Sequence, residues 1–129
     1  MEQGFLIDTN ILIYYADGKI PQPQLARITQ ILQDSFLIST ISRIEFLGWN
    51  KLIGADLLKA EVFLASAKVF YVDNAVEEKA TELKRGYKMA TPDAIVAATA
   101  LLNQLTLVTR NTKDFDRITD LQLYNPFEV

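Results

Sequence analysis

The stretch that decides the fold is Phe5-Leu6-Ile7-Asp8-Thr9-Asn10-Ile11-Leu12-Ile13-Tyr14-Tyr15. Residues 3–8 form a short apolar run that ends in one carboxylate, which is typical of a strand buried on both faces of a parallel sheet. Apolar residues from Ile11 onward then recur at helical spacing. Asp8 therefore falls where a strand ends and a helix begins. Either it caps that helix, or it is functional, because ligands collect at the carboxyl ends of strands in open α/β sheets.

The composition limits the chemistry that this chain can perform. The 129 residues are 50% hydrophobic and 22% charged, which is the profile of a folded protein, and we expect a single domain over residues 1–129. The sequence contains no Cys and no His. Thiolate zinc sites, cysteine nucleophiles and Ser-His-Asp triads are therefore excluded. If the protein is an enzyme, its chemistry comes from carboxylates, Lys, Arg, Tyr, hydroxyls or a metal ion held by oxygen, for which Mg²⁺ or Mn²⁺ is favoured.

The formal net charge of −3 gives no global basic field that would attract a nucleic acid. Carboxylates gathered in a site would contribute to this deficit, and a bound divalent cation would reverse the sign locally. The N-terminus lacks the basic region of a signal peptide, and no apolar run approaches the roughly 20 residues that span a bilayer. We therefore expect a cytoplasmic protein without a membrane segment.

Strand and helix patterns alternate along the chain. Predicted strands cover residues 3–8, 36–39, 69–72, 105–109 and 121–124, and predicted helices cover 9–17, 41–49, 55–67, 75–88 and 91–103, with a further helix after the prolines at 21 and 23. Thr91-Pro92-Asp93 is predicted to start the last helix with Thr91 as N-cap. Gly18 and Gly54 are predicted to break helices. The alternation predicts a mostly parallel sheet of four to five strands flanked by helices.

Acidic positions recur where predicted strands end. Glu45 lies in an apolar neighbourhood after the second strand, where we expect incomplete solvation, although a helix Glu paired with Arg43 or Lys51 is the ordinary alternative. Asp93 could simply favour the first turn of its helix. Parallel strands nevertheless bring Asp8, Glu45, Asp93 and the polar run Asn111 to Asp114 to one edge of the sheet. Such a cluster would repel itself strongly unless a cation neutralised it, so the pattern predicts a Mg²⁺ or Mn²⁺ site.

Three motifs occur in order along the chain: Leu6-Ile7-Asp8-Thr9-Asn10, then Thr91-Pro92-Asp93-Ala94-Ile95-Val96-Ala97-Ala98-Thr99-Ala100, then Val108-Thr109-Arg110-Asn111-Thr112-Lys113-Asp114-Phe115. This ordered set resembles the PIN-domain ribonucleases, and specifically the VapC-type toxins of bacterial toxin–antitoxin pairs. Glu45 falls where the family places its second acid. The resemblance spans essentially the whole chain. It implies a PIN-like three-layer sandwich and Mg²⁺- or Mn²⁺-dependent hydrolysis of RNA.

The resemblance also implies roles for individual residues. It carries over Asp8, Glu45 and Asp93 as metal-site acids. Many relatives have Asp where this chain has Asn111, so Asp114, or less favourably Asp116, is expected to supply the fourth carboxylate. The remaining expected contributors are Thr9, Asn10 and Asn111 as supporting groups, and Arg43, Arg110 and Lys113 as RNA phosphate contacts.

The same resemblance implies two protein partners. Family members usually dimerise and are inhibited by a cognate antitoxin laid over the catalytic groove. Tyr14, Tyr15, Phe46 and Trp49 could line such a surface, although aromatic residues at helical spacing are more often core residues.

Three other functions are alternatives to this prediction. A haloacid-dehalogenase-like phosphatase needs a second Asp two residues after the first, and Asn10 occupies that place. A response-regulator receiver could use Asp73 but needs a late-strand Lys and paired early acids, which the sequence lacks. The remaining alternative is a catalytically inactive PIN-fold protein that binds RNA or protein. If the enzyme prediction holds, the carboxylate oxygens of Asp8, Glu45 and Asp93 should lie within roughly 4–6 Å of one another, close enough to share an ion.

Overall fold

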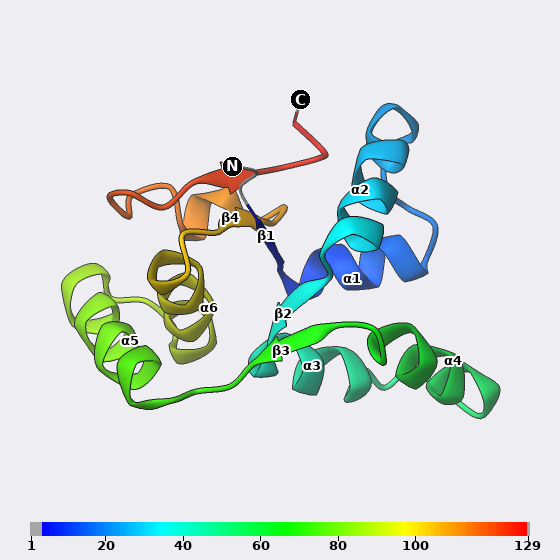
Figure 1. The fold of residues 1–129 in the computed structure, drawn as a ribbon, viewed down its shortest axis with the longest axis horizontal. Helices are drawn as coiled ribbons and strands as arrows, with labels where there is room; N and C mark the ends of the chain where they lie inside the picture. The colour runs from blue at the N-terminus through cyan, green and yellow to red at the C-terminus, as the bar shows by residue number, and fades with distance from the viewer. Residues whose placement is uncertain (1–3, 129) are drawn as a thin grey trace.

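The computed structural model describes residues 4–128 and is organised around one five-stranded sheet (Figure 1). The strands are β1 (Phe5–Ile7), β2 (Leu37–Ser39), β3 (Lys68–Phe70), β4 (Thr106–Val108) and β5 (Leu123–Tyr124). Their order across the sheet is β3-β2-β1-β4-β5, and every neighbouring pair is parallel. All strands therefore point their carboxyl ends toward the same edge, with β1 in the centre.

Six α-helices and one 3₁₀ turn connect the strands. They are α1 (Thr9–Ala16), α2 (Gln22–Asp34), α3 (Thr40–Leu47), α4 (Ala55–Leu64), α5 (Asn74–Tyr87), α6 (Thr91–Leu102) and the 3₁₀ turn η1 (Thr112–Asp114). In Figure 1, α5 and α6 lie to one side of the sheet, and α1 and α2 lie to the other. The predicted three-layer α/β architecture is confirmed.

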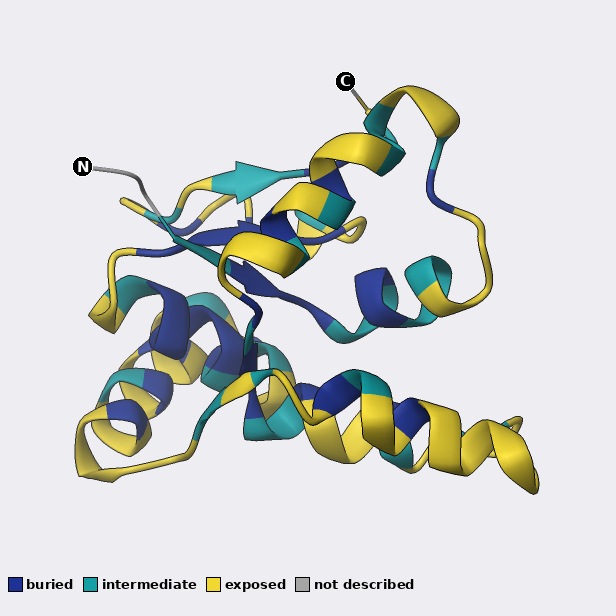
Figure 2. Ribbon diagram, turned by 45° about the vertical axis from the view of Figure 1, so that its right-hand side comes forward, coloured by how far each residue is buried: buried dark blue, intermediate teal, exposed yellow. Residues whose placement is uncertain are grey.

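Alternate residues of the strands build two separate cores, because successive side chains of a strand point to opposite faces. Leu6 and Leu107 join the core that contains the inward faces of α5 and α6. Ile7 and Val108, the next residue of each strand, join the core formed with α1 to α4. Figure 2 shows these buried residues in dark blue along the strands and on the inward helix faces. The central strands are thus buried on both faces, as their continuous apolar sequence predicts.

Several predicted boundaries differ from the observed ones. Residue 3 of the first predicted strand lies outside the described residues. The third strand is Lys68–Phe70 and not 69–72, because the chain turns away and leaves Tyr71 and Val72 exposed. Thr91 is the first helical residue of α6 and Ala90 stands at the N-cap, so the prediction that Thr91 caps this helix is wrong.

The predicted helix breaks are confirmed at both glycines. Gly18 has a φ of 68° and Gly54 has a φ of 59°, a backbone conformation that other residues adopt at a cost. Gly18 follows α1, and Gly54 is the residue immediately before α4. Among the residues that the structure describes, no helix is long and apolar enough to cross a membrane.

Candidate active site

The carboxyl edge of the sheet contains a small hollow with an acidic lining. Its volume is about 350 Å³. The lining residues come from four separated parts of the sequence and are Asp8, Thr9, Asn10, Ile13, Glu45, Asp93 and Asn111. Three acids and three supporting residues predicted from the sequence therefore share one hollow.

Asp8 is the innermost acid of the hollow and caps a helix, which is one of the two roles that the sequence left open. It is the N-cap of α1, and its Oδ1 accepts a hydrogen bond of 2.9 Å from the backbone N–H of Thr9. Its Oδ2 accepts from the side chains of Thr109, at 2.8 Å, and Asn10, at 3.2 Å. Only 8% of its surface is exposed, and this burial raises the pKa of Asp8 despite the hydrogen bonds.

Thr109 is a functional candidate that the sequence interpretation missed. It is the first residue after β4, is 0% exposed and donates its hydroxyl to Asp8. The same hydroxyl oxygen accepts from the Asn10 side chain at 3.2 Å and from the backbone N–H of Asn111 at 3.1 Å. A Thr at a strand end carries little signal by itself, but its place opposite Asp8 in neighbouring parallel strands could have indicated the contact.

Glu45 projects from α3 toward the first turn of α1. Its Oε1 accepts a hydrogen bond from the hydroxyl of Thr9. The side chain is exposed, so the expectation that apolar neighbours would limit its solvation is wrong. This part of α3 faces outward. The neighbouring residue Ile44 is also exposed, whereas Phe46 packs in the core. Neither Arg43 nor Lys51 forms an ion pair with it in the described part of the chain.

Asp93 lies in the first turn of α6 and is half-buried. Burial, and after it the negative charges of Asp114, Asp8 and Glu45, together raise the pKa of Asp93 to about 6. Asp114 itself is exposed on η1 and does not line the hollow, whereas Asn111 does. Asp116 is exposed as well.

The acids of the hollow do not form a ready-made metal-binding group of three side chains. Within residues 4–128, no group of three or more acidic side chains is arranged so that it could hold a metal ion. Like charges repel, and only a cation would offset the cost of bringing three carboxylates together. That these three acids share one ion stays a prediction.

The donor set nevertheless fits a hard divalent cation. Mg²⁺ is commonly bound through one or two carboxylates while it keeps several waters, so a full protein cage is not required. Asp8 and Asp93 line the same hollow, and the charge of Asp8 helps to raise the pKa of Asp93. The amide and hydroxyl groups of the lining offer further oxygen donors, and the lining contains no competing thiolate or imidazole.

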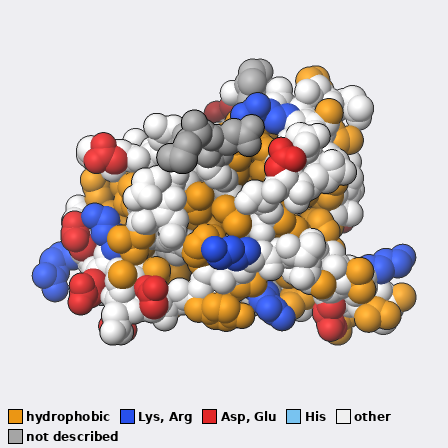
Figure 3. All heavy atoms as spheres, in the orientation of Figure 1, with side chains coloured by type: hydrophobic (Ala, Val, Ile, Leu, Met, Phe, Trp, Pro, Cys, Tyr) orange, Lys and Arg blue, Asp and Glu red, His pale blue; other side chains and the backbone are white. Residues whose placement is uncertain are grey.

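The three basic residues predicted to contact RNA phosphates lie in different environments. Lys113 is exposed on η1, and Arg43 lines a different hollow between α3 and α4. The guanidinium carbon of Arg110 lies over two aromatic rings, 5.1 Å from the ring centre of Tyr14 and 4.1 Å from that of Phe127. On the face drawn in Figure 3, basic and acidic side chains are interspersed and form no basic patch.

The fold and the hollow together define an α/β protein with an acidic site at the carboxyl edge of a parallel sheet. The PIN domain family model matches residues 5–121, and the chain belongs to the PIN domain family.

Similar proteins were found by sequence and by structure. Ribonuclease VapC1 of Haemophilus influenzae is 28% identical over 132 residues, which cover 92% of this chain and 94% of that protein. A toxin-antitoxin complex from Klebsiella pneumoniae contains a chain that is 31% identical with a TM-score of 0.77, covering 98% of this chain and 100% of that one. VapBC-1 from nontypeable Haemophilus influenzae has a TM-score of 0.80 at 24% identity, with coverage of 96% and 98%, and supports the fold alone.

Proposed function

We propose that this chain is a Mg²⁺- or Mn²⁺-dependent ribonuclease and the toxin of a VapBC-type toxin–antitoxin pair, acting in the cytoplasm. Membership of the PIN domain family and similarity to proteins named Ribonuclease VapC1 support the activity. The observation that carries the proposal is the hollow itself, because it collects Asp8, Glu45 and Asp93 at the carboxyl edge of the sheet.

The proposed chemistry assigns separate tasks to the acids. Asp8 and Asp93 would hold the cation, which when bound supplies charge stabilisation for the phosphodiester and lowers the pKa of water. Thr109 and Asn10 keep the Asp8 carboxylate in one orientation by donating hydrogen bonds to its Oδ2. Glu45 is exposed and oriented by Thr9, so it is the carboxylate best placed to accept a proton from an attacking water.

The proposal is tested by cleavage of a fluorophore-quenched RNA oligonucleotide of randomised sequence. Asp8→Ala and Asp93→Asn should each lower the Mg²⁺-dependent rate by at least about a hundredfold, since each removes a proposed cation ligand. Circular dichroism should show that both variants remain folded. Asp56→Asn is the matched control, because Asp56 occupies the first turn of α4 as Asp93 occupies that of α6. Wild-type rates in either site variant would reject the assignment.

The fourth acidic position is decided by a pair of substitutions. We propose that Asp114 supplies this carboxylate, supported by its charge effect on the pKa of Asp93. Asp114→Ala should then slow cleavage more than Asn111→Ala. The opposite order would assign the position to Asn111, which lines the hollow.

The alternative is a catalytically inactive PIN-fold protein that binds RNA or protein. The lack of a three-carboxylate group within the described residues is the observation that favours it. RNA binding without cleavage at any Mg²⁺ or Mn²⁺ concentration would support this alternative over the enzyme.

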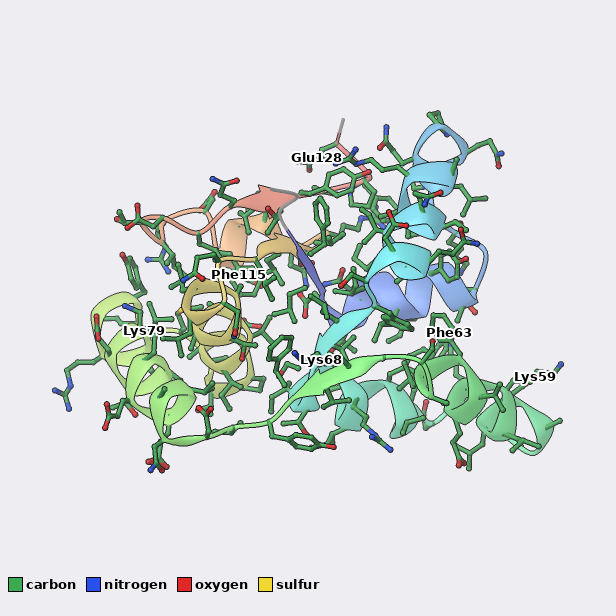
Figure 4. The ribbon with its side chains drawn as sticks, viewed as in Figure 1. Lys59, Phe63, Lys68, Lys79, Phe115 and Glu128 are labelled. Carbon is green, nitrogen blue, oxygen red and sulfur yellow. The ribbon has the colours of Figure 1, made fainter. Side chains whose placement is uncertain are left out.

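An antitoxin is the protein partner that we propose, since the structures similar to this chain include VapBC complexes. We propose that the antitoxin docks at a hollow of about 430 Å³ between α1, α3 and α4. The residues that line this hollow include Tyr15, Phe46, Trp49 and Phe63. Figure 4 shows Phe63 turned toward α1 and α2, and its ring stacks on Tyr15 at 5.8 Å. Phe46 is only 1% exposed, so it forms the floor of this hollow and belongs mainly to the core.

A homodimer is the remaining part of the proposal. Ile44 and Tyr71 are large apolar side chains that are mostly exposed, and Ile44 is adjacent to Glu45 on α3. Light scattering after gel filtration should give the mass of two chains. A monomer at all concentrations would reject this part and leave the enzymatic part standing.

A further inference from the structure

The loop that follows β4 is hydrogen-bonded to one residue near each end of the described chain. The backbone N–H of Arg110 donates to Oδ1 of Asn10, a residue 100 positions away in the sequence, at 3.1 Å. The carbonyl of Arg110 accepts from Nδ2 of Asn125 at 3.3 Å. This loop also contains Thr109, whose hydroxyl fixes Asp8. Its backbone position therefore affects the geometry of the innermost acid.

The C-terminal segment closes this set of contacts through Phe127. The Oδ1 of Asn125 accepts a hydrogen bond of 2.8 Å from the backbone N–H of Phe127. The Phe127 ring lies 4.9 Å from the Tyr14 ring, centre to centre, and the Arg110 guanidinium lies over both. The side chain of Arg110 is thus held by α1 and by the C-terminal segment together.

We propose that this stack fixes residues 109–111, so that Phe127 and Arg110 are positioning residues for the reaction proposed above. A guanidinium over aromatic faces is attracted by the ring quadrupoles. Here this attraction joins the loop after β4 to α1 and to the C-terminal segment. The inference rests on the proposed function, and it differs from the sequence expectation that Arg110 contacts an RNA phosphate. A phosphate contact would act on substrate binding, whereas a positioning residue acts on turnover.

The structure supplies a matched control for this stack. The guanidinium carbon of Arg27, on α2, lies 5.7 Å from the ring centre of Phe5 and 5.0 Å from that of Tyr124. This is the same arrangement of one cation over two rings, and none of its members lines the acidic hollow. The backbone N–H of Thr109 donates to the carbonyl of Tyr124, and Arg27→Ala leaves both of these backbone groups in place. Arg27→Ala therefore reproduces the loss of such a stack without changing a residue of the loop at 109–111.

The experiment combines amide hydrogen exchange with kinetics on the fluorophore-quenched RNA. Phe127→Leu should speed exchange at the Arg110 and Asn111 amides and lower kcat, each by about fivefold, because the cation–ring attraction is lost while an apolar side chain is kept. KM should stay within about twofold, since no substrate contact is removed. Phe127→Tyr, which keeps the ring, should behave as wild type, and Arg27→Ala should leave both readouts unchanged.

A double variant tests whether Arg110 and Phe127 act through the same contact. Arg110→Ala combined with Phe127→Leu should lower kcat no further than Arg110→Ala alone, because the two residues act through one contact. Unchanged exchange at Arg110 and Asn111 in Phe127→Leu would overturn the inference. A raised KM in Arg110→Ala with no effect of Phe127→Leu would also overturn it in favour of a phosphate contact. If the wild type cleaves no RNA, the proposed function fails, and the exchange data still decide whether the stack fixes the loop.

Discussion

Asp93 illustrates how the hollow acts on a single carboxyl group. Burial and the charges of three neighbouring acids raise its pKa to about 6. In the unfolded chain this group has the ordinary Asp value near 3.8. Between these two values the folded chain holds a proton that the unfolded chain has lost. The resulting stability is present below about pH 4 and is lost as the pH rises through about 6.

The direction of this pH dependence of stability leads to a prediction for Asp93→Asn. In EDTA at pH 7.5, the variant should be more stable than wild type by roughly 1 kcal/mol, after allowing for solvent screening of a half-buried group. At pH 4 the difference should nearly vanish, because Asp93 is then protonated in the folded wild type. Urea unfolding at the two pH values measures this. A variant that is less stable at pH 7.5 would show that the Asp93 charge is not repelled.

Thr109 is the second residue whose substitution is informative. Thr109→Val keeps the shape but removes the hydroxyl that donates to Asp8. We expect Mn²⁺ affinity, measured by calorimetry, to fall by about 10- to 100-fold, as is typical when a group that orients a ligand is lost. Thr99→Val is the matched control, because Thr99 is equally buried but donates only to the Ile95 carbonyl within α6. Equal affinities of Thr109→Val and wild type would contradict the orienting role.

At the scale of the secondary-structure elements, α3 contains a buried hydroxyl without a hydrogen-bond partner among the described residues. Ser42 is 0% exposed, and its hydroxyl is the one buried side-chain polar atom within residues 4–128 that lacks a hydrogen-bond partner. A buried unpaired hydroxyl costs free energy, and Ala has the higher helix propensity. The helix is therefore expected to be stronger without this group.

Ser42→Ala should raise the free energy of unfolding by about 1 kcal/mol, which corresponds to about 3 °C in Tm. Ser39→Ala should change stability in the opposite direction by a similar amount, because the Ser39 hydroxyl caps α3 by accepting from the Ile41 backbone N–H. Thermal unfolding of both variants makes the comparison. A destabilised Ser42→Ala would mean that the hydroxyl has a partner that the geometry does not reveal.

The elements also show what the sequence can predict. The strand–Asp8–helix transition is readable because apolar runs and helical spacing are local patterns, and parallel strands necessarily bring their carboxyl ends together. The exposure of Glu45 was mispredicted, because the direction in which a helix turn faces depends on packing against distant elements. The contacts of Arg110 with Tyr14 and Phe127 could not be predicted, since nothing local relates the loop after β4 to the C-terminal segment.

At the scale of the whole molecule, the site joins elements from the two faces of the sheet. Asp8 follows β1, Glu45 lies on α3 after β2, and Asp93 opens α6 before β4. A cation shared by Asp8 and Asp93 would therefore connect elements that pack into different cores. Binding to the folded state alone raises the free energy of unfolding with the logarithm of the ligand concentration once this exceeds the Kd.

Mg²⁺ at ten times its Kd should consequently add about 1.4 kcal/mol to the free energy of unfolding, or about 4 °C in Tm. The shift should disappear in Asp93→Asn and persist in Asp56→Asn. Differential scanning calorimetry with and without the cation gives the result. An equal shift in all three proteins would indicate nonspecific binding of the cation outside the hollow.

The most direct test of the account is to locate Mn²⁺ by anomalous scattering in crystals of the full chain grown with the cation. We expect one strong anomalous peak in the hollow, beside the carboxylates of Asp8 and Asp93, and its loss in crystals of Asp93→Asn. An empty hollow at a Mn²⁺ concentration that supports RNA cleavage, or a peak bound elsewhere on the molecule, would contradict it.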